Sequence, residues 1–121
     1  MGDVVLLLGL EEPLDQELQR ALRSENRTVH ISPPQPAEAG RDLIERLRPN
    51  LVFLGGDWRS VVELLRAAPA PVVVVSPRPE IADWLDAIEA GAADYCAPPF
   101  ESSHLRWILE SASKPARRMA A

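Results

Sequence analysis

Cysteine is almost absent from this chain of 121 residues, which contains Cys96 and no other cysteine. A disulfide within the chain is therefore excluded, and a reducing compartment is the simplest setting. The chain also lacks a long hydrophobic run, because the apolar stretch 4–8 is far too short to span a bilayer. Asp3 precedes that stretch, where a secretory signal carries basic residues. We therefore expect a soluble, cytoplasmic protein.

Positive charge is scarce as well. The chain has 13 Lys and Arg against 18 Asp and Glu, so its net charge is −5. Nucleic-acid binding depends on clustered cations, and the only basic cluster is Lys114, Arg117 and Arg118. We expect no direct nucleic-acid contact by this domain. Residues 1–113 are expected to form one domain, and 114–121 a C-terminal tail or the start of a linker to an output domain.

Three short apolar runs predict buried strands at 4–8, 51–54 and 72–75. Each run is continuous rather than alternating, which is typical of a parallel sheet with helices on both faces. Residues 28–32 and 94–97 are weaker strand candidates. Prolines punctuate the segments between these runs, as expected for the joints between elements.

Apolar residues at helical spacing lie between the strand candidates, and each stripe is expected to face the sheet. The stripes consist of Leu14, Leu18, Ala21 and Leu22; Ala39, Leu43 and Leu47; Val61, Leu64 and Leu65; Ile81, Leu85 and Ile88; and Leu105, Ile108, Leu109 and Ala112. Alternating strands and helices predict a single parallel α/β sheet with right-handed crossovers. Sites in such sheets lie at the carboxyl ends of the strands.

The segment 90–100, AGAADYCAPPF, resembles a signature of response-regulator receiver domains of two-component systems. That signature is alanine-glycine-alanine, then aspartate-tyrosine, then lysine-proline-phenylalanine. Ser76 stands where the family has its Ser or Thr, and 49–54 resembles the approach to its phosphorylated aspartate. The resemblance covers nearly the whole chain. It implies a flavodoxin-like, doubly wound sheet of five parallel strands, in the order 2-1-3-4-5, with helices on both faces.

According to the same resemblance, the positions that receivers use for phosphoryl transfer are occupied here by residues that cannot support this chemistry. Receivers use an aspartate nucleophile, a magnesium ion held by that aspartate and an acidic pair, a lysine, and a Ser or Thr hydroxyl. Here the nucleophile position is Gly55, the acidic pair is Leu10 and Glu11, and the lysine position is Pro98. We therefore expect no catalytic residue, no enzymatic activity, no cofactor, and weak or absent magnesium binding. Pro99 aligns with the family's cis proline, so the Pro98–Pro99 peptide is expected to be cis.

Four polar residues remain around the expected pocket: Glu11, Glu12, Asp57 and Ser76. Asp57 lies two residues beyond Gly55 and could serve as a displaced phosphoacceptor, although capping of the third helix is the favoured interpretation. Gly55 and Gly56 could present backbone amides to an anion with help from Arg59, although a simple tight turn is favoured there.

Three aromatic residues are candidates for switching or recognition. Tyr95 matches the switch aromatic of receivers, which turns inward when the Ser or Thr moves; we expect one fixed rotamer and leave its direction open. Trp107 lies nearly opposite the apolar stripe of its expected helix, and Trp84 lies at the edge of its own. Outward aromatics are favoured interface anchors, although partial burial of Trp84 is an equal alternative.

The leading hypothesis is therefore a degenerate receiver, or pseudo-receiver, that regulates by protein contact and independently of phosphorylation. The resemblance implies that a protein partner or a second copy uses the face formed by the expected helix 81–88, strand 94–97 and helix 105–112. The alternatives are a small-ligand or anion sensor in the former pocket, and a working phosphoacceptor at Asp57.

Overall fold

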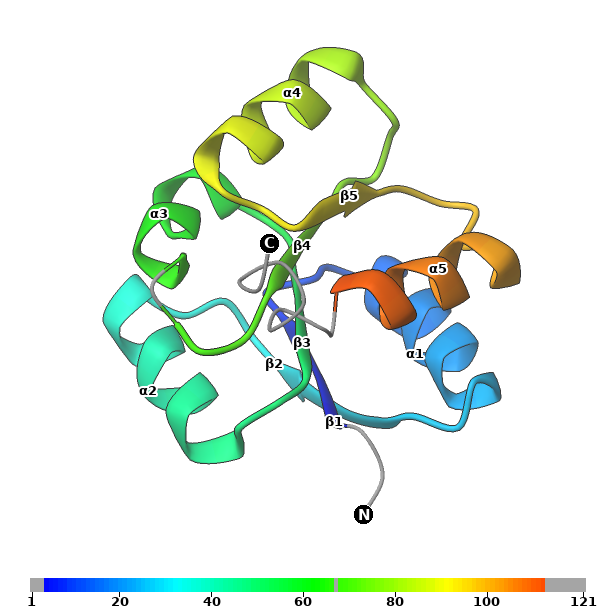
Figure 1. Ribbon diagram of the computed structural model, residues 1–121, viewed down its shortest axis with the longest axis horizontal. Helices are drawn as coiled ribbons and strands as arrows, with labels where there is room; N and C mark the ends of the chain where they lie inside the picture. The colour runs from blue at the N-terminus through cyan, green and yellow to red at the C-terminus, as the bar shows by residue number, and fades with distance from the viewer. Residues whose placement is uncertain (1–3, 67, 113–121) are drawn as a thin grey trace.

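A five-stranded parallel sheet forms the centre of the molecule (Figure 1). The computed structural model describes residues 4–66 and 68–112. The strand order is β2-β1-β3-β4-β5, as predicted. The strands are β1 (Val4–Leu8), β2 (Thr28–Ser32), β3 (Leu51–Leu54), β4 (Val72–Val75) and β5 (Asp94–Cys96). The predicted strand ranges are confirmed, except that β5 ends one residue early.

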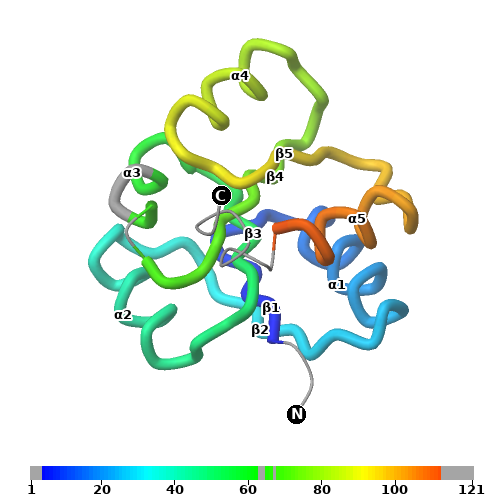
Figure 2. Tube along the Cα trace, viewed as in Figure 1, coloured from blue at the N-terminus to red at the C-terminus, as the bar shows by residue number. Residues whose placement is uncertain are grey.

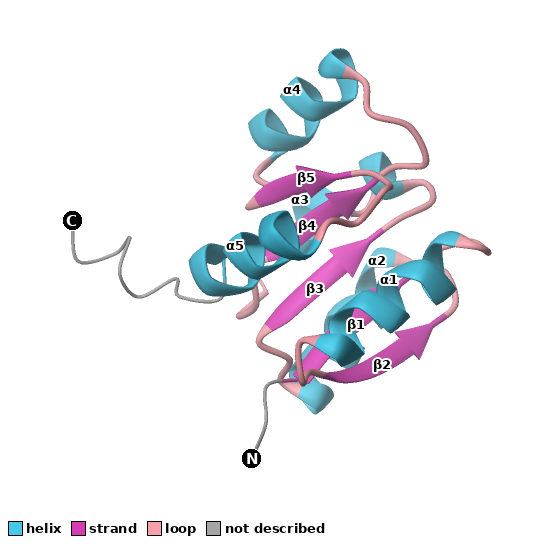
Figure 3. Cartoon of the chain, turned by 90° about the vertical axis from the view of Figure 1, so that its right-hand side faces the viewer, coloured by secondary structure: helices cyan, strands magenta, loops and turns pink. Residues whose placement is uncertain are grey.

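Helices cover both faces of this sheet (Figures 1 and 3). Following the chain trace in Figure 2, α1 and α5 lie on one side, while α2 and α3 lie on the other. The helices are α1 (Leu14–Ser24), α2 (Ala37–Leu47), α3 (Val62–Leu65), α4 (Ile81–Ala90) and α5 (Ser102–Ala112), with a 3-10 turn, η1 (Trp58–Ser60), before α3. The predicted flavodoxin-like architecture is therefore confirmed.

Each face of the sheet has its own hydrophobic core, because successive strand residues point to opposite sides. Val5, Leu7 and Phe53 pack with α1 and α5, whereas Leu6 and Val52 pack with α2, α3 and α4. The predicted stripe of α5 is confirmed as core, with Leu105, Ile108, Leu109 and Ala112 buried. In the α1 stripe, Leu18 and Leu22 are buried, whereas Leu14 and Ala21 are partly buried against the same core.

The predicted buried stripe of α4 is wrong. Ile81, Leu85 and Ile88 are 41–74% exposed, and Ala87 is the residue of this helix that is fully buried. Helical spacing groups residues on one face but does not say which face meets the sheet. A small residue, Ala87, meets the second core instead, so the large apolar side chains of α4 remain in solvent.

Two smaller differences concern α2 and α3. The centre of the buried α2 face is Gly40 and Ile44, one residue further along than predicted, and Leu43 and Leu47 are only partly buried. In α3, Val62 and Leu65 are buried, while the side chain of Leu64 lies outside the described residues. The expected tail 114–121 and the domain end at 113 also lie outside them.

No helix within 4–66 and 68–112 combines the length and apolarity that a membrane crossing requires.

Candidate functional site

A cavity of about 690 Å³ lies at the carboxyl ends of β1, β3 and β4, where parallel α/β sheets place their sites. The loops after these strands line it, together with the β5–α5 loop. Every predicted pocket remnant borders this cavity. Its polar and charged lining residues are Glu11, Glu12, Glu17, Asp57, Arg59, Ser76, Arg78, Glu80 and Asp83.

Gly55, at the expected nucleophile position, is buried at the end of β3. Its backbone N–H donates to the Leu8 carbonyl oxygen at 3.0 Å, which extends the β1–β3 pairing by one residue. A Cβ at this position would lie only 3.1–3.2 Å from the Leu10 side chain and Cα. Leu10 itself packs into the core beneath α1 and α5. An apolar side chain thus fills the space beside Gly55, and an aspartate there would need that side chain to move.

The remaining receiver positions do not form a metal site. Glu11 and Glu12 are exposed beyond Leu10, and Pro98 lines the cavity where a lysine was expected. The described residues contain no group of three or more His, Cys, Asp or Glu side chains arranged to hold a metal ion. The donor set therefore does not fit the magnesium ion that the receiver resemblance implies.

The predicted cis peptide between Pro98 and Pro99 is confirmed, and a second cis peptide precedes Pro13 in the β1–α1 loop. The second cis peptide was not predicted from the sequence.

Asp57 does not cap α3, contrary to the favoured prediction. It precedes the 3-10 turn η1, and its carboxylate makes no capping hydrogen bond. Its backbone carbonyl oxygen instead accepts from the Ser60 hydroxyl at 2.9 Å. Because η1 intervenes, α3 begins only at Val62, too far along the chain for an Asp57 cap. The exposed carboxylate borders the cavity.

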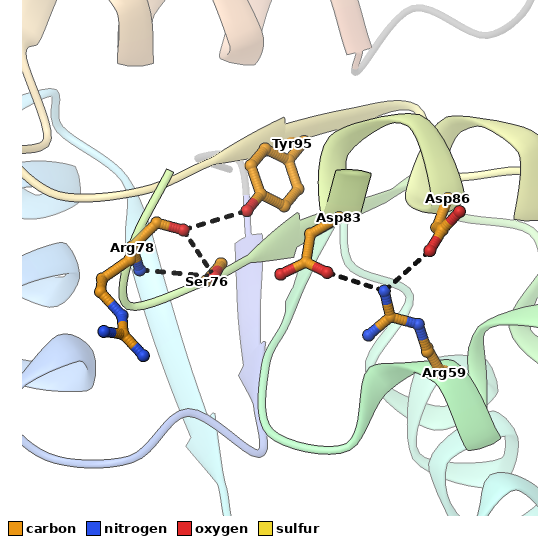
Figure 4. Close-up of polar contacts among 6 residues, drawn as sticks. All are labelled: Arg59, Ser76, Arg78, Asp83, Asp86 and Tyr95. Carbon is orange, nitrogen blue, oxygen red and sulfur yellow. Dashed lines mark hydrogen bonds and ion pairs between the residues drawn. The ribbon is translucent and has the colours of Figure 1, made fainter. Parts of the chain in front are cut away.

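The Ser76 and Tyr95 hydroxyls meet at one acceptor (Figure 4). Ser76 Oγ donates to the Arg78 carbonyl oxygen at 2.9 Å, and Tyr95 Oη donates to the same oxygen at 3.2 Å. Tyr95 is 9% exposed and packs with the second core. The direction left open from the sequence is therefore inward. Ser76, which directly follows β4, and Tyr95 on β5 together hold the loop that leads into α4.

Arg59 connects the other side of the cavity to α4 (Figure 4). Its Nη2 lies 2.7 Å from Asp83 Oδ1 and 2.9 Å from Asp86 Oδ2, and its guanidinium stacks over the Trp58 ring at 4.5 Å. The hydrogen bonds that Arg59 donates to Asp83 and then to Asp86 raise the pKa of Arg59. This ion-pair network was not predicted from the sequence, because Arg59 and its partners lie 24 and 27 residues apart. The spacing of Asp83 and Asp86 on one helix was the available signal.

The geometry disfavours an anion site around Gly55 and Gly56. The Gly55 N–H, the Ser76 hydroxyl and the Arg59 guanidinium already have partners within the protein. Six carboxylates line the cavity with two guanidinium groups: Glu11, Glu12, Glu17, Asp57, Glu80 and Asp83 against Arg59 and Arg78. An incoming phosphate would therefore meet excess negative charge and few free donors.

Both candidate interface tryptophans lie in solvent, on helices that flank the edge strand β5. Trp84 on α4 is 45% exposed, and Trp107 on α5 is 61% exposed. Figure 1 shows α4 and α5 on either side of β5. The third tryptophan, Trp58, is buried beneath Arg59.

Solved structures of receiver domains share this fold. A putative response regulator from Chloroflexus aurantiacus matches with a TM-score of 0.78 and 20% identity, covering 93% of this chain and 98% of that one. The receiver domain of the sensor histidine kinase PA1611 from Pseudomonas aeruginosa matches with a TM-score of 0.74 and 21% identity, covering 93% and 98%. NtrX from Brucella abortus, solved with ADP, matches with a TM-score of 0.75 and 26% identity.

The match to NtrX covers 99% of this chain but only 29% of NtrX, so the chain spans less than a third of that protein. No protein-family model matches the chain, and no curated protein does either. Architecture, strand order and these structural similarities together show that the chain has the fold of response-regulator receiver domains.

Proposed function

We propose that this chain is a receiver-like regulatory module of two-component signalling that acts by protein contact, without phosphorylation. The main support for this proposal is the pair of residues beside the cavity. Gly55 has no side chain that could act as a nucleophile, and the Leu10 side chain fills the space next to it. Pro98 supplies neither charge nor a backbone donor at the lysine position. The module is a non-enzyme without a resident cofactor, and it works in the cytoplasm.

The PA1611 receiver domain was solved with a magnesium ion coordinated in its active-site cleft. In the present chain, Leu10 replaces one carboxylate of the expected acidic pair and Gly55 replaces the ligating aspartate. Magnesium dehydrates reluctantly and requires near-octahedral oxygen ligation. Weak or absent magnesium binding follows from this donor set.

Intact-mass measurement after treatment with magnesium and acetyl phosphate tests the proposal. We expect no gain of a phosphoryl group, while a receiver with the complete pocket, run in parallel, gains one. A phosphoryl adduct on the wild-type chain that disappears in Asp57→Asn would overturn the proposal and make Asp57 the acceptor. An adduct that survives Asp57→Asn would overturn it equally and place the acceptor elsewhere.

The contact surface of this module is the face formed by α4, β5 and α5. Trp84 and Trp107 provide large exposed aromatic area on it, and such side chains dominate the energetics of many interfaces. Tyr95 supports the face from within, because its hydroxyl holds the loop before α4. NtrX is an example of a longer protein that contains this fold, and an output domain beyond residue 121 fits the same arrangement.

A ligand sensor in the cavity is the second candidate, favoured by the cavity's size of about 690 Å³. Thermal shift with phosphate, nucleotides and magnesium separates it from the contact module. A saturable rise in melting temperature, lost in Ser76→Ala, would favour the sensor.

A further inference from the structure

The exposed side of α4 carries a continuous apolar stripe. Ile81, Trp84, Leu85 and Ile88 lie at positions i, i+3, i+4 and i+7, which is one face of a helix, and all four are 41–74% exposed. Scattered apolar residues are ordinary on protein surfaces, whereas a contiguous group of large ones marks an interaction site. With ten residues, the helix offers a stripe about 15 Å long.

Acidic residues border this stripe. Helix α4 and the residue before it contain Glu80, Asp83, Asp86 and Glu89, and this segment contains no Lys or Arg. Glu80 lies one turn before Trp84, whose backbone N–H donates to the Glu80 carbonyl oxygen. Glu89 follows Leu85 on the other flank, at about 100° per residue.

The two acids that point toward the rest of the protein are already paired, since Arg59 contacts Asp83 and Asp86. In the described residues, Glu80 and Glu89 are exposed and take part in none of the ion pairs. The negative charge left at the rim of the stripe is therefore available to an incoming partner.

A second copy of this chain is a poor occupant of the stripe. Apposing two α4 helices would bring carboxylates against carboxylates, and like charges across an interface are unfavourable. The one Arg or Lys on α4 or α5 within the described residues is Arg106, which pairs with Glu25 on the α1 side. No free cation on these two helices is available to neutralise a partner's Glu80 and Glu89.

We propose that the α4 stripe binds an amphipathic helix that carries apolar side chains on one face and Lys or Arg along its edges. Two helices packed side by side bury the stripe, and the basic edges pair with Glu80 and Glu89. This inference rests on the proposed contact function and specifies the chemistry of its partner.

The test uses two synthetic peptides of about 18 residues, long enough to form helix alone. Both carry the same Leu and Phe positions on one face; one has Lys along the edges of that face, and the other has Glu there. We expect the Lys peptide to bind roughly tenfold or more tightly than the Glu peptide in fluorescence anisotropy. Added salt should reduce the difference in affinity between the two peptides, because screening weakens exposed charge pairs. Amide chemical shifts should move along α4.

Matched variants test whether the peptide binds at the α4 stripe and whether the acidic residues beside the stripe determine its preference for Lys. Leu85→Glu should reduce binding of the Lys peptide roughly tenfold, while Ile31→Glu, which adds the same charge at a residue of similar exposure on the far edge strand β2, should not. Glu89→Lys should reduce the preference for the Lys peptide, whereas Glu45→Lys on α2 should leave it unchanged. Unchanged melting temperatures confirm that each variant is folded.

Equal binding of both peptides, no binding of either, or shifts confined to other elements would overturn the inference. A concentration-dependent dimer in analytical ultracentrifugation would also overturn the inference if Leu85→Glu dissociates that dimer. This result would support the proposed contact function but contradict the proposed basic partner. Phosphorylation of the chain would instead remove the proposed function, while a preference for the Lys peptide that Leu85→Glu abolishes would still support the α4 site.

Discussion

At the scale of single residues, the most informative pair is Gly55 and Leu10. The two are distant in sequence, and the three atoms nearest to a hypothetical Cβ at Gly55 all belong to Leu10. The glycine at position 55 is only part of the local arrangement, because the apolar side chain of Leu10 occupies the neighbouring space. A carboxylate introduced at position 55 would therefore meet Leu10.

Gly55→Asp should lower the free energy of unfolding by about 1–3 kcal/mol, because the new side chain overpacks against Leu10. In a Leu10→Ala background the same substitution should cost less, since the obstructing side-chain atoms Cγ and Cδ1 are gone and only Cα remains close. Urea unfolding of both single variants and the double variant measures this coupling. Additive effects of the two substitutions would show that Leu10 does not fill the Gly55 space.

Cys96 is a second case in which the surroundings determine the behaviour of a residue. Burial, followed by the charge of Asp94, raises the pKa of its thiol from 9.0 to about 12. The folded protein therefore disfavours the thiolate, and the unfolded chain does not. Because the folded pKa is the higher one, the resulting stability is complete below pH 9 and declines between pH 9 and about 12.

Wild-type protein should thus lose stability above pH 9, by at most about 1.4 kcal/mol per pH unit from this group. Cys96→Val should show a shallower decline over the same range, as measured by urea unfolding at several pH values. Native protein should also resist thiol-labelling reagents until it unfolds. Rapid labelling of the native state would contradict the burial of this residue.

At the scale of elements, α4 is held to the molecule by small apolar residues together with polar contacts. Its buried contribution to the core is the small Ala87, while Arg59 reaches across from η1 to Asp83 and Asp86. Ser76 and Tyr95 fix the loop that precedes it. A helix attached in this way keeps its large apolar residues free, which is the arrangement that a docking helix requires.

Arg59→Gln should loosen α4 without unfolding the domain, because the exposed ion pairs are weak individually but are the main link from η1 to this helix. Backbone amides of α4 should exchange with solvent several times faster, while those of β1 and β3 keep their protection. Hydrogen exchange followed by NMR measures the effect. Arg20→Gln on α1, which removes an arginine without an ion pair in the described residues, is the matched control. Equal acceleration in both variants would contradict the role of Arg59.

At the scale of the whole molecule, the three tryptophans differ in their burial. Trp58 is buried under Arg59, whereas Trp84 and Trp107 lie in solvent on either side of β5. Burial, rather than residue type, therefore separates structural aromatics from candidates for recognition.

Trp84→Ala and Trp107→Ala should each change the free energy of unfolding by less than about 1 kcal/mol, yet weaken partner association by roughly 2 kcal/mol. Trp58→Ala should instead destabilise the fold by about 3–5 kcal/mol. Thermal melts combined with pull-down of the native partner distinguish the two classes. Full association in both surface variants, with loss of association in Ser76→Ala, would move the working site to the cavity.

The sequence by itself determined the sheet. Continuous apolar runs marked the strands, and their alternation with helical stripes indicated one parallel layer, because both patterns depend on spacing along the chain. It also determined the chemistry available at positions 55 and 98, since Gly55 has no side chain and Pro98 has neither a charge nor a backbone N–H, whatever their surroundings. The cis peptide before Pro99 followed from its aligned position in the receiver signature, and it is present.

Only the tertiary structure decided which way α4 faces, what fills the space beside Gly55, and where Arg59 finds its partners. Each of these depends on side chains that are far apart in sequence. Helical periodicity defines a stripe equally well whether it is buried or exposed, so the outward face of α4 could not be predicted from spacing. Its direction follows from packing: Ala87 meets the core and Arg59 holds the inner acids, which leaves the apolar stripe and its outer carboxylates in solvent.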